Sequence, residues 1–482
     1  MTRTWIRTWI RRWVWMVWLA WPIPAWTADY VVIVSEATST DAPWRAVADS
    51  LAKKHGGEVI ECKQSPLEMR ERLAGEHAPR WLAWVARPQE LGPGPVAAMH
   101  RLSRALDGDP YTDCRWGIVT GGSAEVAARV VAEEKPLVVR EVGGGTSFAS
   151  ECVTSGRWFS EFKAGEVWVK PAGGKASLVA GEADSVPAIV RFLNEGKPDC
   201  FITSGHASEH DWQPGYGFRD GTFTAKHGTL TGMALDGSTH PVHSPNPKIF
   251  LAVGNCRAGN IPASDDCMML AWIGSAGVRQ SIGYTVNTWF GYAGWGVLDY
   301  FLEQPGRFTL AEAWLANDHA LVWQLGQLDK SLLTKNVEPG TTVGNGTAAG
   351  LLHDRDVTAF YGDPKWEARM APGPLRWRET LTENPVGEFT WKIIPQAGRE
   401  TFATVDSNGS TRGGRPLIVF LPRRLAAPVL LEGASWKPLL ADDFVLLPNP
   451  GTATDPPTEI VIRFRAASPA PPAHSPANPN VE

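Results

Sequence analysis

The sequence predicts an α/β protein with a mostly parallel sheet flanked by helices, followed by a small β-sandwich. Over residues 29–370, short β-branched runs such as Tyr30–Val34 alternate with segments of helical periodicity, which is typical of a parallel sheet. Two of these runs end in a glycine turn and a reactive side chain. Beyond about residue 380, apolar runs are separated by Pro, Gly and Asp with no helical period between them, which favours antiparallel sheets.

Residues 1–28 have the composition of a secretory signal peptide. Four arginines precede the apolar run Trp13–Trp21, and Ala25 and Ala28 are candidate cleavage positions. An uncleaved membrane anchor is the alternative, because Trp26 fits a small-residue cleavage rule poorly. The apolar run is shorter than the ~20 residues that a span requires, so we expect an exported protein that is secreted, periplasmic or on the cell surface.

Charge and cysteine content argue against a nucleic-acid-binding protein and against a zinc-ribbon protein. The 482 residues carry a formal charge of −5, and removal of residues 1–28 with their four arginines lowers it to −9. Lysine and arginine are scattered, which argues against binding to nucleic acid or to anionic lipid through bulk electrostatics. The six cysteines show no CxxC spacing, so a zinc ribbon is not expected. In an exported chain they could all be paired, but a free Cys256 would leave at least one other thiol reduced.

The first unit, residues 29–190, is expected to alternate strands and helices. A strand at Tyr30–Val34 precedes a helix over 44–55, which the pair Gly56-Gly57 ends. The further expected elements are a strand at 59–60, a helix at 66–73, strands at 81–85 and 116–121, and a helix at 124–134. Glycine-rich stretches at 143–145 and 171–175 precede a soft boundary near residue 190.

The second unit, residues 191–370, repeats the alternation. A helix near Pro187 leads into a strand at 201–203, a loop is expected over 207–247, and strands follow at 249–253 and 278–284. The helix at 310–325 is expected to be amphipathic, with Glu312, Asn317 and Asp318 on its polar side. Residues 380–466 predict an Ig-like β-sandwich, and residues 467–482, rich in Pro and Ala, predict a disordered tail.

The strongest chemical signal is a histidine and a cysteine at two strand ends. Gly205-His206-Ala207 follows one strand, and Asn255-Cys256 follows the next, 50 positions after His206. Reactive groups of open α/β sheets lie beyond the carboxyl ends of the strands, so neighbouring strands would bring imidazole and thiol together. Histidine can take the proton that makes cysteine a nucleophile. The backbone N–H groups of Ala207 and Cys256 are then the candidate oxyanion hole. A core thiol, or a disulfide to Cys267, is the alternative for Cys256.

On these motifs the chain resembles the caspase-like cysteine peptidases, and among them the gingipain-like exported enzymes. Looser support comes from Asp109-Pro110-Tyr111, Ser275–Val278 and Tyr361–Pro364. The resemblance implies a caspase-like fold, a catalytic dyad of His206 and Cys256, and an endopeptidase that forms a thioester with a protein or peptide substrate. It implies no cofactor, although a structural calcium ion is compatible with it. Ala207 departs from the glycine usual in this family, and no position matches the family's specificity acid.

Two other functions stay open. A catalytically inactive relative would act as an extracellular binding or adhesion protein through its β-sandwich. The run His206–His210 also spells H-x-x-E-H, a zinc-peptidase signature, but that chemistry requires a helix and a third ligand. Asp211–Gly215 follows at once and leaves room for scarcely one helical turn.

Several polar and aromatic positions have no assigned role. The loop residues His227, Asp236, His240 and His243 are read as solvated rather than as cation ligands. Asp220, Asp265 and Asp266 have the same status, although one of them could line a pocket for a basic side chain. The stripe 289–296 is read as a wall of the substrate cleft or as core. The sequence indicates no oligomeric state.

Overall fold

The computed structural model describes residues 29–75, 78–264, 266–396, 401–451 and 457–466. The predicted signal peptide and the predicted tail lie outside these residues. In the described part of the chain, none of the helices combines the length and the hydrophobicity that crossing a bilayer demands.

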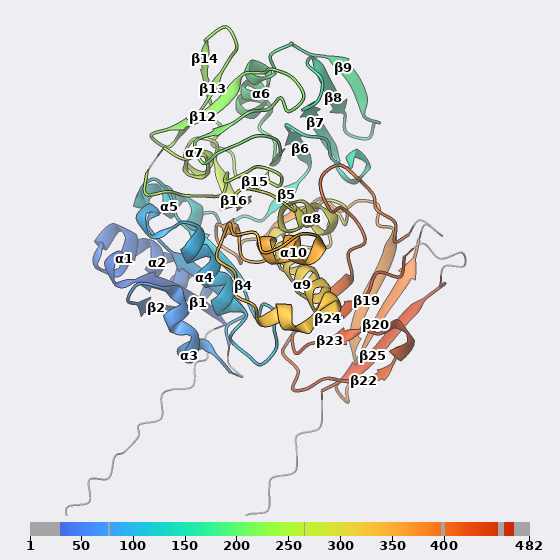
Figure 1. The fold of residues 1–482 in the computed structure, drawn as a ribbon. Coiled ribbons are helices and arrows are strands. Elements are labelled where there is room, and N and C mark those ends of the chain that lie inside the picture. The colour runs from blue at the N-terminus through green and yellow to red at the C-terminus, as the bar shows by residue number, and fades with distance from the viewer. Residues whose placement is uncertain (1–28, 76–77, 265, 397–400, 452–456, 467–482) are drawn as a thin grey trace, which may run out of the picture.

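A twelve-stranded sheet runs through the molecule (Figure 1), in the order β2-β1-β3-β4-β17-β16-β15-β10-β6-β7-β8-β9. Its neighbouring strands are parallel except for the pairs β16–β17, β7–β8 and β8–β9. The strands are β1 (Tyr30–Ser35), β2 (Glu58–Cys62), β3 (Trp81–Val85), β4 (Arg115–Val119), β6 (Glu141–Gly144), β7 (Ser155–Phe159), β8 (Glu166–Lys170), β9 (Ser177–Ala180), β10 (Cys200–Thr203), β15 (Lys248–Ala252), β16 (Val278–Tyr284) and β17 (Thr358–Tyr361). The predicted α/β class with a mostly parallel sheet is confirmed.

The predicted boundary near residue 190 falls within this one sheet. β10, from the second predicted unit, pairs with β6 of the first, and β17 pairs with β4. The two halves therefore share a sheet and one continuous hydrophobic core.

Helices cover both faces of the sheet because its strands alternate two apolar faces. Val32 and Val34 pack with α2 and α5, whereas Val31 and Ile33 belong to the core on the opposite side, with α4. The helices are α1 (Glu36–Thr40), α2 (Ala42–His55), α3 (Arg70–Leu73), α4 (Pro93–Ser103), α5 (Ala124–Val131), α6 (Val186–Arg191), α7 (Met268–Gly274), α8 (Tyr292–Phe301), α9 (Leu310–Leu328) and α10 (Thr347–Asp354). Gly56 ends α2 in the left-handed conformation, with φ 64°, as the sequence predicted.

The expected loop over 207–247 is instead a four-stranded antiparallel sheet. It contains β11 (Asp211–Trp212), β12 (Thr222–Lys226), β13 (Thr229–Met233) and β14 (Thr239–Pro241). Its central hairpin turns at His227 and Gly228, whose φ values of 48° and 68° match a two-residue hairpin turn. The alternation Thr222-Phe223-Thr224-Ala225 before this turn was the sequence signal for it.

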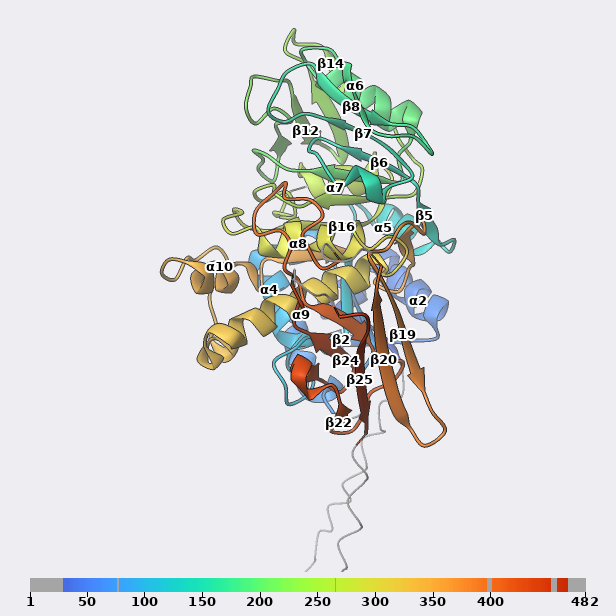
Figure 2. The same cartoon turned by 90° about the vertical axis from the view of Figure 1, so that its right-hand side faces the viewer.

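The C-terminal residues form two antiparallel sheets around a core of their own (Figure 2). One sheet has the order β19-β20-β25-β22 and the other β21-β24-β23. The strands are β19 (Trp377–Glu383), β20 (Glu388–Pro395), β21 (Leu417–Phe420), β22 (Val429–Glu432), β23 (Leu439–Leu440), β24 (Phe444–Leu447) and β25 (Ile460–Arg465), and a separate pair joins β5 (Leu137–Val139) to β18 (Ala368–Met370). We call residues 377–466 the β domain.

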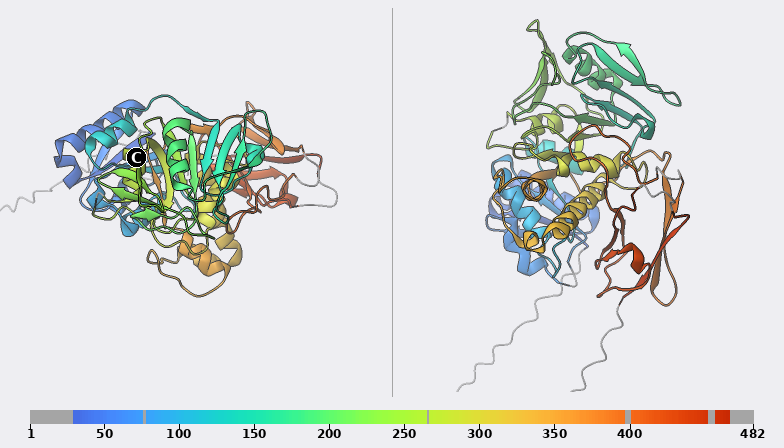
Figure 3. Two further views of the ribbon diagram at one scale, coloured as in Figure 1. Left: turned by 90° about the horizontal axis from the view of Figure 1, so that it is seen from above. Right: turned by 45° about the vertical axis from the view of Figure 1, so that its right-hand side comes forward.

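The β domain packs beside α9 (Figure 3), and the polar side expected for that helix packs against α8 and against the segment before β4 instead of facing solvent. Asn317 and Asp318 are buried rather than solvated. The Asn317 amide donates to the carbonyls of Tyr292 and Ala293, and Asp318 accepts from Thr112. A helix that is covered on several sides needs such partners for its polar side chains.

Candidate active site

Strands β10 and β15 are parallel neighbours, in a register that pairs Thr203 with Ala252. Both strands therefore end at the same edge of the sheet. His206 follows β10 and Cys256 follows β15, and both side chains line one pocket of about 370 Å³. The two residues that the sequence singled out thus share a pocket at the carboxyl ends of adjacent strands.

His206 stands at the mouth of this pocket. Gly205 before it has φ +91°, a conformation that favours glycine, and so turns the chain out of the sheet. The exposed imidazole stacks on the ring of Tyr216, with 4.8 Å between centroids and 28° between planes. The Tyr216 N–H donates to the Glu161 carbonyl, which fixes this aromatic partner beside the site.

Cys256 is half-buried, and its Sγ donates to the Thr288 carbonyl over 3.9 Å. All six cysteines lie in the described part of the chain and none forms a disulfide, which excludes the bridge to Cys267. Among the described residues, neither the His206 ring nor the Cys256 sulfur is hydrogen-bonded to the other. Arg257, the next residue, has φ 57°, so the thiol sits at a sharp backbone turn.

The candidate oxyanion donors have no competing acceptor. Ala207 lies opposite Trp212 in an antiparallel bridge whose hydrogen bonds run through Ser208 and Gln213 instead. Within the described residues, the N–H groups of Ala207 and Cys256 have no hydrogen-bond partner. Cys256 itself lines the pocket, whereas Ala207 follows the lining residue His206 and is not part of the lining.

Asn255, which the sequence analysis did not single out, ties the two strand ends together. Its side chain is fully buried, accepts from the Thr203 hydroxyl over 2.6 Å, and donates to the Gly205 carbonyl over 3.2 Å. The Asn255 amide thus binds the chain on both sides of Ser204, and Asn255 itself directly precedes Cys256. The only sequence signal for it was a polar residue directly before the candidate nucleophile.

A second connection joins the residues beyond the two reactive groups. Arg257 forms an ion pair with Glu209, whose side chain is largely buried. Glu209 belongs to the H-x-x-E-H run, but residues 206–212 form bends and a short strand rather than a helix. The two histidines therefore do not share a helical face, and Glu209 serves Arg257. The zinc-peptidase interpretation loses its structural basis.

Glu161 places a buried carboxyl at the pocket, a feature that the sequence analysis missed. It follows β7, and it accepts hydrogen bonds from the Thr146 and Ser204 hydroxyls. Burial raises the pKa of this carboxyl above its usual range, an effect that the two hydrogen bonds partly oppose. Its partners lie 15 and 43 positions away, so no local motif could have revealed it.

The remaining walls are aromatic or come from the β domain. Trp289 is 45% exposed at the rim, and Trp295 of α8 is buried and also lines the pocket. The stripe 289–296 therefore contributes both to the cleft and to the core. Asn408, Gly409 and Ser410 of the β domain line the pocket as well.

The acidic residues considered from sequence lie elsewhere. Asp220 caps the start of α6 by accepting from Ser185, and Asp266 accepts from the His227 N–H. Neither lines the pocket, and Asp265 lies outside the described residues. In the part of the chain that the structure describes, His227, Asp236, His240 and His243 form no cluster of potential metal ligands.

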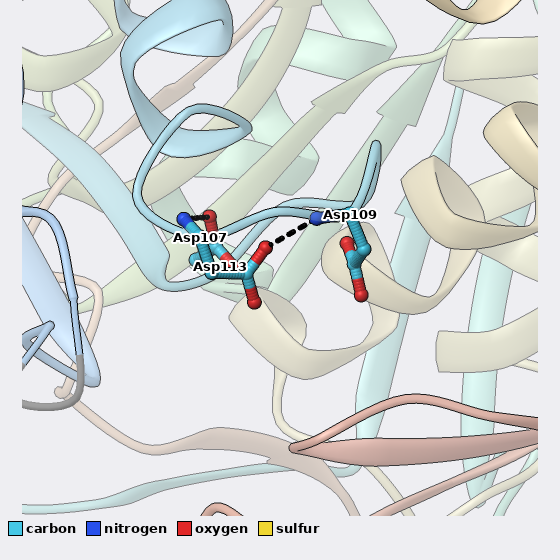
Figure 4. Close-up of side chains that lie close together, drawn as sticks. All are labelled: Asp107, Asp109 and Asp113. Atoms are coloured by element: carbon cyan, nitrogen blue, oxygen red, sulfur yellow. Dashed lines mark hydrogen bonds between the residues drawn. The ribbon is translucent and has the colours of Figure 1, made fainter. Parts of the chain in front are cut away.

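Three carboxyls gather in the loop after α4 (Figure 4). Oxygens of Asp107, Asp109 and Asp113 lie within 4.8 Å of one another. The Arg424 guanidinium lies 3.8 Å from both Asp107 and Asp113 and already supplies positive charge there. Burial, followed by the hydrogen bond and charge of Asp107, raises the pKa of Asp113 to about 10. A cluster that pairs with arginine and in which burial keeps Asp113 protonated is a poor fit to calcium, which prefers ionised carboxylates.

Comparisons with known proteins add little. No family model matches the chain, and no curated protein matches it. A solved structure described as "Structure of Protease" is 14% identical, with a TM-score of 0.41, and the match covers 91% of this chain and 94% of that chain. A likeness this low carries no argument about function.

Proposed function

We propose that the protein is an exported cysteine endopeptidase of the caspase-like type, with Cys256 as nucleophile and His206 as general base and acid. One observation carries the proposal. Two adjacent parallel strands deliver an imidazole and a half-buried thiol to the same pocket, and among the described residues the N–H groups of Ala207 and Cys256 have no hydrogen-bond partner.

The chemistry runs in two halves. The Cys256 proton passes to His206 as the sulfur attacks a peptide carbonyl carbon, and the resulting oxyanion accepts from the Ala207 and Cys256 N–H groups. Collapse breaks the C–N bond, His206 returns its proton to the leaving amine, and a thioester remains. Water then attacks the thioester while His206 takes one of its protons, and the acid and the Cys256 thiol are released.

Both reactive groups must move from their present contacts to begin this sequence. The Cys256 thiol has to leave the Thr288 carbonyl, and the His206 ring, whose face stacks on Tyr216, has to present a ring nitrogen to the sulfur. His206 is exposed, so rotation of its side chain meets little packing. Catalytic hydrogen bonds often form only when substrate is bound.

The test is hydrolysis of a mixed peptide library by the chain without residues 1–28. Replacement Cys256→Ala should lower the rate by at least about 10³-fold, and His206→Ala by about 10²- to 10⁴-fold. Cys152→Ala, which removes a buried thiol outside the pocket, is the matched control and should leave the rate unchanged. Full activity of Cys256→Ala would rule out the proposal.

One observation favours a second candidate, a catalytically inactive binding protein. The imidazole and the thiol each have another partner, Tyr216 and the Thr288 carbonyl. In that case no peptide of the library would be cleaved, and Cys256→Ala would bind peptides as well as the unaltered chain does. Cleavage that depends on Cys256 would exclude this candidate.

A further inference from the structure

A segment of the β domain reaches the candidate active site. Residues 401–416, here called the β-domain loop, precede β21, and the loop rises beside α8 toward β6 and β7 (Figure 2). Its tip, Asn408 to Ser410, lines the pocket that holds His206 and Cys256. This pocket is therefore built from both parts of the molecule.

Buried charges hold the base of the loop against α8. Arg412 donates to Asp299 over 2.6 Å and also pairs with Glu303, and all three side chains are nearly inaccessible. The Gly413 N–H donates to Asp299 over 3.0 Å. Arg415 lies 3.2 Å from Asp299 as well. Removing one partner from such a buried pair is costly, so this end of the loop is firmly fixed.

Hydrogen bonds connect the loop tip to the buried acid of the pocket. The Asn408 side-chain amide donates to the Thr146 hydroxyl and to the Ser147 carbonyl, each over 2.9 Å. The Thr146 hydroxyl in turn donates to Glu161 over 2.6 Å. Because Asn408 supplies the hydrogen to Thr146, it orients that hydroxyl toward the carboxyl.

Close packing fixes the position of the tip against the aromatic wall. Gly409 has φ +98°, and a Cβ placed there would lie 2.2 Å from Cδ2 of Trp295. A Cβ on Gly291 would lie 2.7 Å from that of Ser410. The backbone of residue 409 thus lies directly on the indole, and no side chain fits between them.

We propose that the β-domain loop is the specificity-determining wall of the substrate cleft, with Asn408 and Gly409 as the residues that set its width. The inference rests on the proposed peptidase function and adds a role for the β domain in it. A peptide bound at Cys256 would pass along this wall, so displacement of the tip should change binding of extended substrates. The chemistry at sulfur should be affected far less.

The test compares two glycines of the same loop. Gly409→Ala forces the tip away from Trp295, whereas Gly414→Ala adds a methyl where nothing lies within 4 Å. Both glycines have positive φ, 98° and 67°, so both substitutions carry backbone strain. Asn408→Ala is the second variant, because it removes the bonds to Thr146 and Ser147 without adding bulk. Folding of each variant is checked by its thermal midpoint.

Two thiol reagents separate the wall from the nucleophile. Iodoacetamide is small, and a tetrapeptidyl chloromethyl ketone must occupy the cleft. We expect Gly409→Ala and Asn408→Ala to change the rate of Cys256 labelling by the peptidyl reagent by about tenfold or more. The rate with iodoacetamide should change less than about twofold, and Gly414→Ala should resemble the unaltered chain with both reagents. In peptide hydrolysis, the same two variants should alter KM more than kcat.

The outcomes distinguish this inference from the proposed function. If the variants differ in labelling by the peptidyl reagent but the protein hydrolyses no peptide, the peptidase proposal is contradicted. The role of the loop as a cleft wall is then still supported. Equal effects of Gly409→Ala and Gly414→Ala, or equal effects on both reagents, would overturn the wall. So would a Cys256 that the peptidyl reagent does not label in the unaltered chain.

Discussion

The Asn255 side chain accepts a hydrogen bond from the Thr203 hydroxyl over 2.6 Å, between two residues that are both buried. Thr203 ends β10, and Asn255 precedes Cys256. The relative position of the two strand ends, and thus of His206 and Cys256, depends on this buried polar contact as well as on the sheet itself.

Breaking this contact should destabilise the fold and misplace the thiol. Asn255→Ala leaves the Thr203 hydroxyl without its acceptor and should cost about 1–3 kcal/mol in the free energy of unfolding. Urea denaturation of Asn255→Ala, Thr203→Val and the double variant should show a coupling of about 0.5–1.5 kcal/mol. Strictly additive losses would mean that the two side chains do not interact.

The turn after Cys256 should tolerate glycine better than alanine. Either substitution removes the ion pair of Arg257 with Glu209, but only glycine adopts φ 57° without strain. We expect Arg257→Gly to be more stable than Arg257→Ala by about 1 kcal/mol in thermal unfolding. An alanine variant as stable as the glycine variant would show that this backbone conformation is relaxed in the protein.

His319 should make the protein sensitive to acid. It is fully buried, neither ring nitrogen has a hydrogen-bond partner among the residues that the structure describes, and it stacks on Phe444 of the β domain at 4.0 Å. Burial, and next the charge of Arg115, lowers its pKa from 6.5 to about 3. As the pH falls, His319 is therefore protonated in the unfolded chain before it is protonated in the folded protein. The free energy of unfolding keeps the full contribution of neutral His319 above about pH 6.5. That contribution is lost progressively toward pH 3, by about 1.4 kcal/mol per pH unit.

His319→Phe should remove that part of the pH dependence. Phenylalanine keeps the stacking on Phe444 and has no ring nitrogen to protonate. The free energy of unfolding, measured between pH 7.5 and pH 4.5, should fall less for the variant than for the unaltered chain. Parallel curves would show that His319 has a normal proton affinity in the folded protein.

Gly294 should be essential to the packing of α8 beneath the site. A Cβ at this position would lie 2.2 Å from the Val253 carbonyl oxygen, just beyond the end of β15. Gly294→Ala should therefore push α8 away and lower the free energy of unfolding by about 1–3 kcal/mol. Gly94→Ala in α4 is the control, because nothing lies within 4 Å of its Cβ, and it should be neutral or stabilising. Equal effects at both positions would contradict this close packing.

Local patterns in the sequence predicted what depends on neighbouring residues. The β-branched run at Tyr30 is a buried strand, and the helix that follows it ends at Gly56. The strands before His206 and Cys256 are adjacent because parallel strands of an α/β sheet commonly lie side by side. The hairpin at His227-Gly228 also had a local signal, although glycine and polar residues around it favoured a loop.

Long-range contacts could not be predicted in this way. Glu161, Thr146 and Asn408 meet although 262 positions separate the last two. The burial of Asp318 depends on Thr112, 206 positions away. Topology and packing decide which polar side chains meet where a sheet edge contacts a second domain. The periodicity of the sequence carries no information about either.

Trapping of a covalent intermediate tests the central claim most directly. The chain without residues 1–28 is mixed with a cleaved library peptide, quenched in acid within one turnover, digested and analysed by mass spectrometry. We predict that the acyl part of the peptide is attached to Cys256 and is released by neutral hydroxylamine, as a thioester would be. Hydrolysis that proceeds with no adduct on Cys256, or with the adduct on another residue, would contradict the account.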